Sequence, residues 1–114
     1  MSCLADLIAT TETGETPVKH PEEERLYGVD FTDDLEVING EFVNSVNDIE
    51  ISSDPTDLTF TDMLLIDAGQ QITVLISGGS HLPGQEREYK ITVIFTTNMD
   101  QRKVVVCLLI VGTP

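Results

Sequence analysis

Apolar and polar side chains alternate along two segments in the second half of the chain. Residues 71–77 and residues 89–96 repeat with a period of two, which is the spacing of a β-strand buried on one face. Glycine and proline interrupt the pattern between them, because glycine permits positive φ and proline cannot donate to a strand ladder. The two strands therefore form either a long antiparallel hairpin or a corner between the two sheets of a β-sandwich. The apolar positions are Ile72, Val74 and Ile76 in the first segment and Tyr89, Ile91, Val93 and Phe95 in the second.

Further short strands are predicted on either side of this pair. Tyr27, Val29 and Phe31 share one face of an extended segment that begins the ordered part of the chain. Asn39-Gly40 is a strong hairpin signal, because both residues tolerate the backbone of a tight turn. Residues 63–66 are too apolar for a surface segment. The predicted strands are residues 27–35, 41–51 with a bulge, 58–66 and 102–111, and the predicted turns are residues 52–57, 67–69 and 98–101.

The last strand contains eight consecutive apolar residues, from Val104 to Val111. Such a run requires cover on both faces of the strand. The opposite sheet covers one face, and either the N-terminal segment or a second molecule covers the other. We favour contact between subunits, because no helix is predicted that could cover this face. Val105 and Leu109 are the candidate interface residues.

These strands, the regular turns and the absence of helical periodicity predict an all-β fold, an antiparallel β-sandwich of about 85 residues. Tyr89 stands near the start of a strand that follows a corner. Its hydroxyl group is a candidate for the hydrogen bond of a tyrosine corner. The alternative is that Tyr89 is an ordinary core aromatic residue.

Residues 1–26 are predicted to form an acidic N-terminal arm, and residues 27–114 the sandwich domain. The arm is polar, acidic and contains two prolines. Its few apolar residues are candidates for docking on a neighbouring protein, namely Leu4, Leu7 and Ile8. The alternative is a terminus that stays disordered.

The charge of the chain is strongly acidic. Its 114 residues fit one domain and carry a formal net charge of −14, with 14 of the 20 acidic residues in residues 1–54. This charge repels phosphate backbones, so no nucleic-acid partner is expected; it suits a basic protein partner or a solvated surface. No apolar run approaches the ~20 residues of a membrane helix, and no signal peptide is apparent. We therefore expect no membrane partner, and a protein that stays in the cytoplasm or is assembled there into something larger.

No constellation of residues predicts a catalytic, metal-binding or cofactor-binding site. Gly79 and Gly84 have the spacing of a phosphate-binding loop, but Gln85 and Glu86 follow where that loop requires Lys and Ser or Thr. The two histidines lack the cysteine or histidine partners of a zinc site, and His81 with a nearby serine lacks a nucleophile elbow.

Two other groups of residues receive structural interpretations. The acidic cluster at residues 30–36 does not have the spacing of a calcium loop, so we interpret it as a solvated strand start; the alternative is a loose calcium site completed by other loops. Cys107 lies in an apolar strand and is expected to be a small buried hydrophobic residue. A disulfide between Cys107 and Cys3 is disfavoured, because it would attach a tail to a core strand.

A set of short motifs follows in a fixed order over residues 27–111, about three quarters of the chain. The motifs are YGVDFTDDL at residues 27–35, GEFVNS at 40–45, SGG at 77–79 with Gly84, Tyr89, Ile91-Thr92 and Thr96-Thr97 after it, and Arg102 before Val104-Val105-Val106. In order and spacing this set resembles the immunoglobulin-like fibre–tail adaptor proteins, small virion proteins of tailed phages.

This resemblance implies an immunoglobulin-like sandwich and a structural, non-enzymatic role without cofactors. Copies would form a homo-oligomeric ring on the neck or tail of the virion and dock tail fibres or neighbouring tail proteins, in part by strand addition. Loop residues Ser80, His81 and Leu82 are candidates for contact with a partner. Two alternatives stay open: a capsid decoration or head–tail connector protein, and a ligand-binding β-sandwich, which the absence of Trp disfavours.

Overall fold

The structure is a computed structural model that describes residues 4–6, 18–31, 35 and 39–112. Within these residues the regular structure consists of β-strands and short 3-10 turns, which confirms the all-β prediction. No helix in the described part of the chain is long and apolar enough to cross a membrane.

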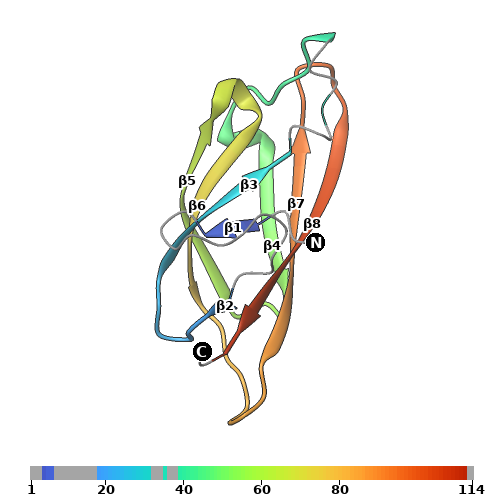
Figure 1. The fold of residues 1–114 in the computed structure, drawn as a ribbon. Helices are drawn as coiled ribbons and strands as arrows, with labels where there is room; N and C mark the ends of the chain where they lie inside the picture. Colours follow the sequence, from blue (N-terminus) through green and yellow to red (C-terminus); the bar gives the residue numbers. More distant parts are fainter. Residues whose placement is uncertain (1–3, 7–17, 32–34, 36–38, 113–114) are drawn as a thin grey trace.

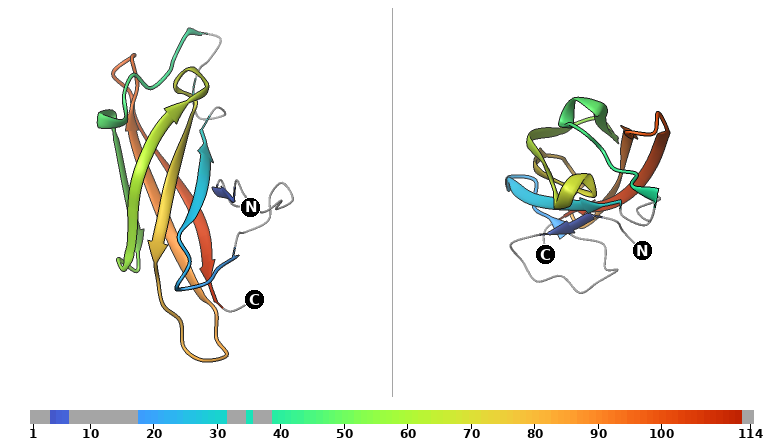
Figure 2. Two further views of the ribbon diagram at one scale, coloured as in Figure 1. Left: turned by 90° about the vertical axis from the view of Figure 1, so that its left-hand side faces the viewer. Right: turned by 90° about the horizontal axis from the view of Figure 1, so that it is seen from above.

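The strands form two four-stranded sheets that pack face to face (Figures 1 and 2). The first sheet has the order β1-β3-β6-β5 and the second has the order β2-β8-β7-β4. All pairs are antiparallel except β2 with β8, which are parallel. The strands are β1 (Leu4–Asp6), β2 (Val18–Lys19), β3 (Arg25–Asp30), β4 (Ile49–Asp54), β5 (Leu58–Ile66), β6 (Gln71–Gly78), β7 (Arg87–Thr96) and β8 (Arg102–Val111).

This strand order is that of an immunoglobulin sandwich. With β3 to β8 taken as strands B to G, the sheets contain strands B, E and D and strands G, F and C, as in the constant-type fold. The first strand is divided, because β1 pairs with β3 in one sheet and β2 pairs with β8 in the other. The immunoglobulin-like topology that the resemblance implied is therefore present.

β6 and β7 form the core in the way that their alternation predicts. They belong to different sheets, so the corner rather than the hairpin is correct. Every apolar position of the alternating pattern is fully buried, and the ring of Phe95 stacks on the ring of Phe31 with 4.6 Å between centroids. The tyrosine corner is also confirmed, because the hydroxyl oxygen of Tyr89 accepts a hydrogen bond from Ser80 N at 2.8 Å and donates to Ser80 O at 3.3 Å.

The predicted strand at residues 41–51 is wrong over its first eight residues. β4 begins only at Ile49, and a 3-10 turn (Val46–Asp48) precedes it. Residues 41–43 are instead held by turns far away in the sequence, because Val43 N donates to Gly69 O at 3.1 Å and Asn98 N donates to Phe42 O at 2.9 Å. These long-range bonds replace the ladder of a local hairpin. Residues 36–38, which precede the predicted Asn39-Gly40 turn, lie outside the described residues.

The expectation that residues 63–66 avoid the surface was also wrong, because two of these side chains are exposed. Leu64 is 62% exposed and Ile66 is 37% exposed. Both lie in β5 after an irregularity in its pairing with β6 between Thr61 and Leu64. Every second side chain beyond that point faces away from the opposite sheet.

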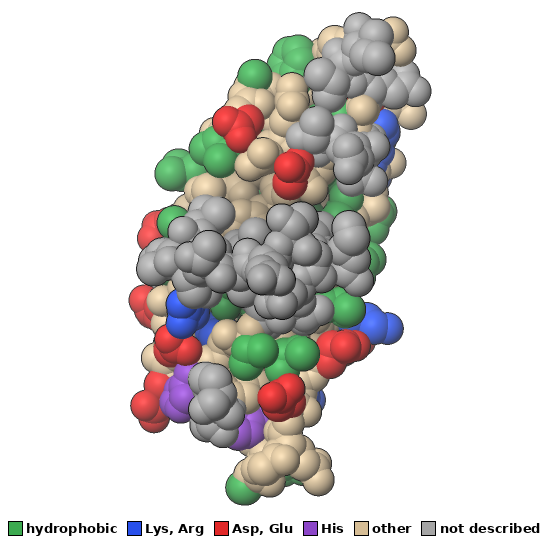
Figure 3. Space-filling view, viewed as in Figure 1, with side chains coloured by type: hydrophobic (Ala, Val, Ile, Leu, Met, Phe, Trp, Pro, Cys, Tyr) green, Lys and Arg blue, Asp and Glu red, His purple; other side chains and the backbone are tan. Residues whose placement is uncertain are grey.

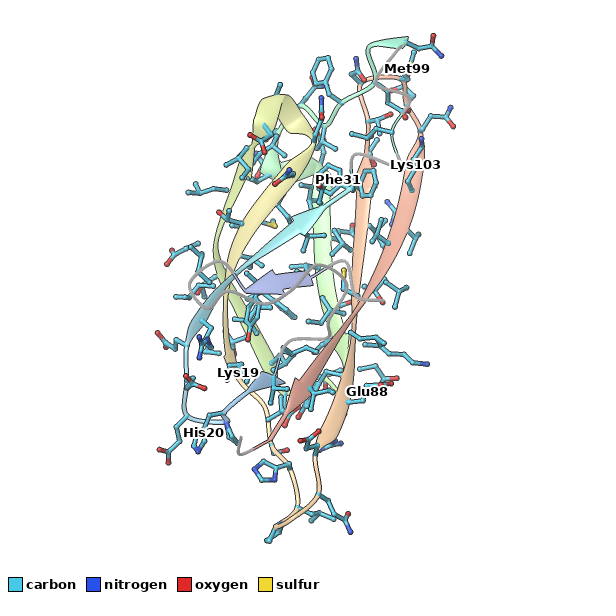
Figure 4. The ribbon with its side chains drawn as sticks, in the orientation of Figure 1. Lys19, His20, Phe31, Glu88, Met99 and Lys103 are labelled. Atoms are coloured by element: carbon cyan, nitrogen blue, oxygen red, sulfur yellow. The ribbon has the colours of Figure 1, made fainter. Side chains whose placement is uncertain are left out.

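The N-terminal segment supplies two short strands to the sandwich, upstream of the domain start that was expected at residue 27. The side chain of Lys19, in β2, is fully buried and donates hydrogen bonds to Gly78 O at 2.7 Å and His20 O at 2.9 Å (Figure 4). Burial lowers the pKa of Lys19, although the nearby charges of Glu23 and Glu24 raise it in part. Gly112 N donates to Lys19 O, so β2 is tied to the ends of β6 and β8.

Cys107 is fully buried in β8, as expected, but it is disulfide-bonded rather than a free thiol. The sequence contains one other cysteine, Cys3, which lies outside the described residues. Disfavouring a disulfide at Cys107 was therefore wrong.

Candidate functional site

The outer face of β8 carries an exposed apolar column. Val105 and Leu109, the residues selected from the sequence, are 9% and 0% exposed and face the core, so their choice as surface residues was wrong. Val104 and Val106 face outward instead and are 58% and 53% exposed. An uninterrupted apolar run carries no parity signal, and the two residues before it are both charged, so the sequence could not tell which valines face out.

Across this face, the outward side chains change from apolar on β8 to acidic on β4. Val104 stands opposite Ile94 of β7, which in turn stands opposite Glu50 of β4. Two rows further along β8, Leu108 stands opposite Lys90, and Lys90 stands opposite Asp54. The face therefore joins an apolar column on β8 to a polar column on β4. We call it the β8 face, defined by Val104, Val106, Ile94, Lys90 and Arg102.

The opposite side of the sandwich carries a second, smaller apolar area. It consists of Leu64 and Ile66 on β5, and Leu64 lies beside Thr73 of β6 in the pairing register. We call it the β5 face, defined by these three residues. In Figures 1 and 3, β5 lies along the left edge of the molecule and β8 on its right, with hydrophobic side chains at the surface over both.

The two sheets differ in charge. Four of the six basic residues of the chain lie on β7 and β8: Arg87, Lys90, Arg102 and Lys103. The acidic residues of the second sheet are Glu50, Asp54 and Glu88. The first sheet instead has three acidic residues, Asp6, Asp30 and Asp62, and one basic residue, Arg25, which is paired with Glu23 at 2.7 Å. Of the four bases, only Lys90 and Arg102 share the outward parity of Val104, and Glu50, Asp54 and Glu88 share it too, so the outer face around β8 carries charges of both signs.

The connection between β6 and β7 contains the predicted contact residues Ser80, His81 and Leu82. Ser80 Oγ donates to the carboxylate of Asp57 at 2.9 Å and accepts from Arg87 at 3.2 Å. The guanidinium of Arg87 lies 5.6 Å from the centroid of the Tyr89 ring. Leu82 is 67% exposed and lies beside a hollow of about 510 Å³ lined by Ser80, His81, Leu82, Gln85, Glu86 and Arg87.

Asp57 holds the base of this connection. Its backbone oxygen accepts a hydrogen bond from Gly79 N at 3.2 Å. Desolvation alone would raise the pKa of the Asp57 carboxyl, but the nearby hydroxyl groups of Tyr89 and Ser80 outweigh it and lower the pKa below its usual value. Gly78, just before the connection, has φ +84, and a Cβ atom there would lie 2.6 Å from Asp57 O, so glycine is required.

The other end of the sandwich is built around a buried ion pair that the sequence did not reveal. Glu41 is 2% exposed; its carboxylate accepts from Lys103 Nζ at 2.6 Å and from Thr97 Oγ1 at 2.9 Å. The amide of Asn98 bonds both to Phe42 N and to Gly40 O. Figure 4 shows Lys103 below Met99 at this end. Glu41 and Lys103 are 62 residues apart, so no spacing rule could have found the pair.

Ser80 and His81, considered above as a nucleophile and a base, form hydrogen bonds with separate partners. Ser80 Oγ is hydrogen-bonded to Asp57, and the Nδ1 atom of His81 lies 2.8 Å from Leu82 O. Among the described residues, no group of three or more His, Cys, Asp or Glu side chains is placed to hold a metal ion.

The remaining predicted residues lie in the N-terminal segment. Leu4 lies in β1, where it pairs with Val29 of the same chain, whereas Leu7 and Ile8 lie outside the described residues.

Comparison with protein families found one that covers most of the chain. A family model described as podophage GP4 fiber-tail adaptor protein gp77 matches residues 19–110. The matched segment runs from the buried Lys19 of β2 to Ile110 near the end of β8. Comparisons with curated proteins and with solved structures found no match.

Proposed function

Because the chain belongs to the podophage GP4 fiber-tail adaptor family, we propose that it is a non-enzymatic adaptor whose copies form a ring in the neck or tail. The family gives the coarse role: a structural component of the phage virion that binds other virion proteins. The ring and the surfaces that build it are our proposal. The observation that carries it is the presence of exposed apolar areas on opposite sides of one sandwich.

Two different surfaces on opposite sides of a protomer suit head-to-tail contact. If the β8 face of one copy packs on the β5 face of the next, each copy uses both faces and a ring can close. A two-fold contact would instead place β8 against β8 and leave the β5 face without cover. Clusters of large hydrophobic side chains at a surface indicate contact sites, so we expect both areas to contact another protein.

Part of the charge distribution suits the same arrangement. The β8 face carries Lys90 and Arg102 beside Glu50 and Asp54, and the first sheet carries Asp30 and Asp62 around the β5 face. Head-to-tail contact brings these opposite charges together, and complementary charges guide association and suppress wrong pairings. A net charge of −14 otherwise makes copies repel one another.

The N-terminal arm belongs to this proposal in a reduced form. The short strand β2 and the buried Lys19 are tied to β6 and β8, which supports placing residues 18–26 with the sandwich. β1 already pairs with β3 of the same chain, so residues 7–17 are the segment proposed to dock on a neighbour, with Leu7 and Ile8 as its apolar side chains. The absence of enzymatic activity is also proposed, and the separate partners of Ser80 and His81 support it.

The test is the mass of the full-length protein in solution, measured by size-exclusion chromatography with light scattering. We expect the wild-type protein to have a mass of several times the 12.5 kDa of one chain. Val104→Asp/Val106→Asp should be a folded monomer, because charges replace the apolar column of the β8 face. Asn44→Asp/Asn47→Asp adds the same charge at exposed positions off both faces and should assemble as wild type does.

Folding of each variant is checked by its thermal midpoint. A monomeric wild type at tens of micromolar, or a double aspartate variant with the mass of wild type, would contradict the ring.

A further inference from the structure

We propose that the turn between β6 and β7 is a rigid knob whose Leu82 inserts into an apolar, basic-rimmed pocket of another virion protein. This inference rests on the proposed function, because it names the surface that meets a partner other than a second copy. The connection extends beyond the two sheets at the lower end of the molecule in Figure 1. A ring built through the sides of the sandwich leaves this end accessible.

The tip of the knob is a tight turn. Gln85 N donates to Leu82 O at 3.0 Å, which closes the four residues Leu82-Pro83-Gly84-Gln85. Gly84 has φ +72, as a type II turn requires at its third residue, and Pro83 stands at the second residue, where proline is common. A Cβ atom at Gly84 would meet nothing within 4 Å, so the backbone conformation and not crowding explains the glycine. The turn fixes Leu82 at its first position.

The base of the knob is held as firmly as its tip. The hydroxyl group of Tyr89 bonds to both the N–H and the carbonyl of Ser80, and the side chain of Ser80 connects to Asp57 and Arg87. A loop that is already ordered loses little conformational entropy when it binds. Leu82 therefore has two properties of an anchor residue: its side chain is exposed before binding, and its backbone position is fixed by the turn.

The exposure of Leu82 distinguishes it within the described part of the chain. At 67% it is the most exposed of the large hydrophobic side chains there, ahead of Leu64 at 62%. The adjoining hollow of about 510 Å³ provides space for side chains at the rim of a partner pocket. An apolar side chain at the tip of a projecting turn has no part in the core of its own domain.

The charges select the chemistry of the partner. Glu86 and Glu88 are exposed next to the knob, within a chain of net charge −14, so a basic rim is favoured. A second copy supplies such a rim poorly. Its Arg25 and Lys103 are paired with carboxylates, its Lys19 is buried, and its Arg87 contacts Ser80 within the knob itself. Its Lys90 and Arg102 lie on the β8 face, which the next copy covers in the proposed ring. The partner is thus a different protein.

The experiment measures binding of the full-length protein to tail-bearing particles purified from a phage that lacks its gene. Leu82→Asp should weaken binding by about tenfold or more, because burial of a leucine is lost and an acid enters the pocket. Leu82→Met should bind as wild type does, since it keeps an apolar side chain at this position. Gln85→Ala, in the same turn, should change binding less than twofold.

All variants must keep the oligomeric mass and the thermal midpoint of wild type. Binding of Leu82→Asp within twofold of wild type would overturn the knob and leave the adaptor role intact. Failure of wild type to bind these particles at all would contradict the proposed function itself.

Discussion

A single hydroxyl group, that of Tyr89, ties the connection between the sheets to the start of β7. It bonds to both backbone groups of Ser80, nine residues earlier, and the ring around it is fully buried. The sequence could suggest this bond, because a tyrosine near the start of a strand after a corner is its usual setting. It could not suggest that Asp57 and Arg87 complete the network, since that depends on the approach of β5 and β7.

Tyr89→Phe tests this bond. We expect it to lower the free energy of unfolding by about 1–2 kcal/mol, because two backbone groups of Ser80 lose their partner while the apolar packing is kept. Urea denaturation measures the loss. Thr61→Val, which removes an exposed hydroxyl on β5, is the matched control and should change stability little. Equal stability of Tyr89→Phe and wild type would show that the corner holds without the hydroxyl group.

Alternation along a strand determines which buried side chains could be predicted from the sequence. The alternation in β6 and β7 gave the buried positions correctly, because polar residues mark the outward face of each strand. β8 has no such marks after Lys103, so Val105 and Leu109 were chosen where Val104 and Val106 face outward. The buried face of a strand can be predicted from a period of two only where polar residues alternate with apolar ones.

At the scale of elements, strands with their own turn signals were predictable and the segment at residues 39–48 was not. The last strand has the predicted bounds, Arg102–Val111, because charged residues and a polar turn precede it. Residues 41–48 contain apolar residues typical of a strand, but Asn98 and Gly69 supply their hydrogen-bond partners from distant turns. Tertiary contacts therefore override the local preference.

The ion pair of Glu41 with Lys103 should be the strongest of these tertiary contacts. Lys103→Met should cost about 2–3 kcal/mol of stability, because it leaves a buried carboxylate without its cation; the Lys103 side chain is partly exposed, which keeps the cost below that of a fully buried pair. Adding Glu41→Gln should recover part of the loss. Urea denaturation of the two single variants and the double variant measures the coupling.

Additive losses in this cycle would contradict the pairing. They would mean that Glu41 and Lys103 stabilise the fold through separate neighbours. Arg102→Met is the matched control, because its ion pair with Glu50 is exposed on both sides and should contribute little.

At the scale of the whole molecule, the sandwich has sides suited to its own copies and an end suited to another protein. The sides are the β8 face and the β5 face, and the end is the knob that carries Leu82. The topology and the family could be anticipated from the order of short motifs, since these motifs mark strands and turns. The surfaces could not, because their exposure depends on which sheet each strand joins.

Cysteine cross-linking between copies tests head-to-tail contact most directly. Leu64→Cys and Val104→Cys, introduced together into the full-length protein, should form disulfide-linked ladders on mild oxidation, because each cysteine meets its counterpart on the next copy. Val104→Cys alone should give no ladder and no dimer. Dimers from the single variant, or no cross-link in the double variant, would contradict the account.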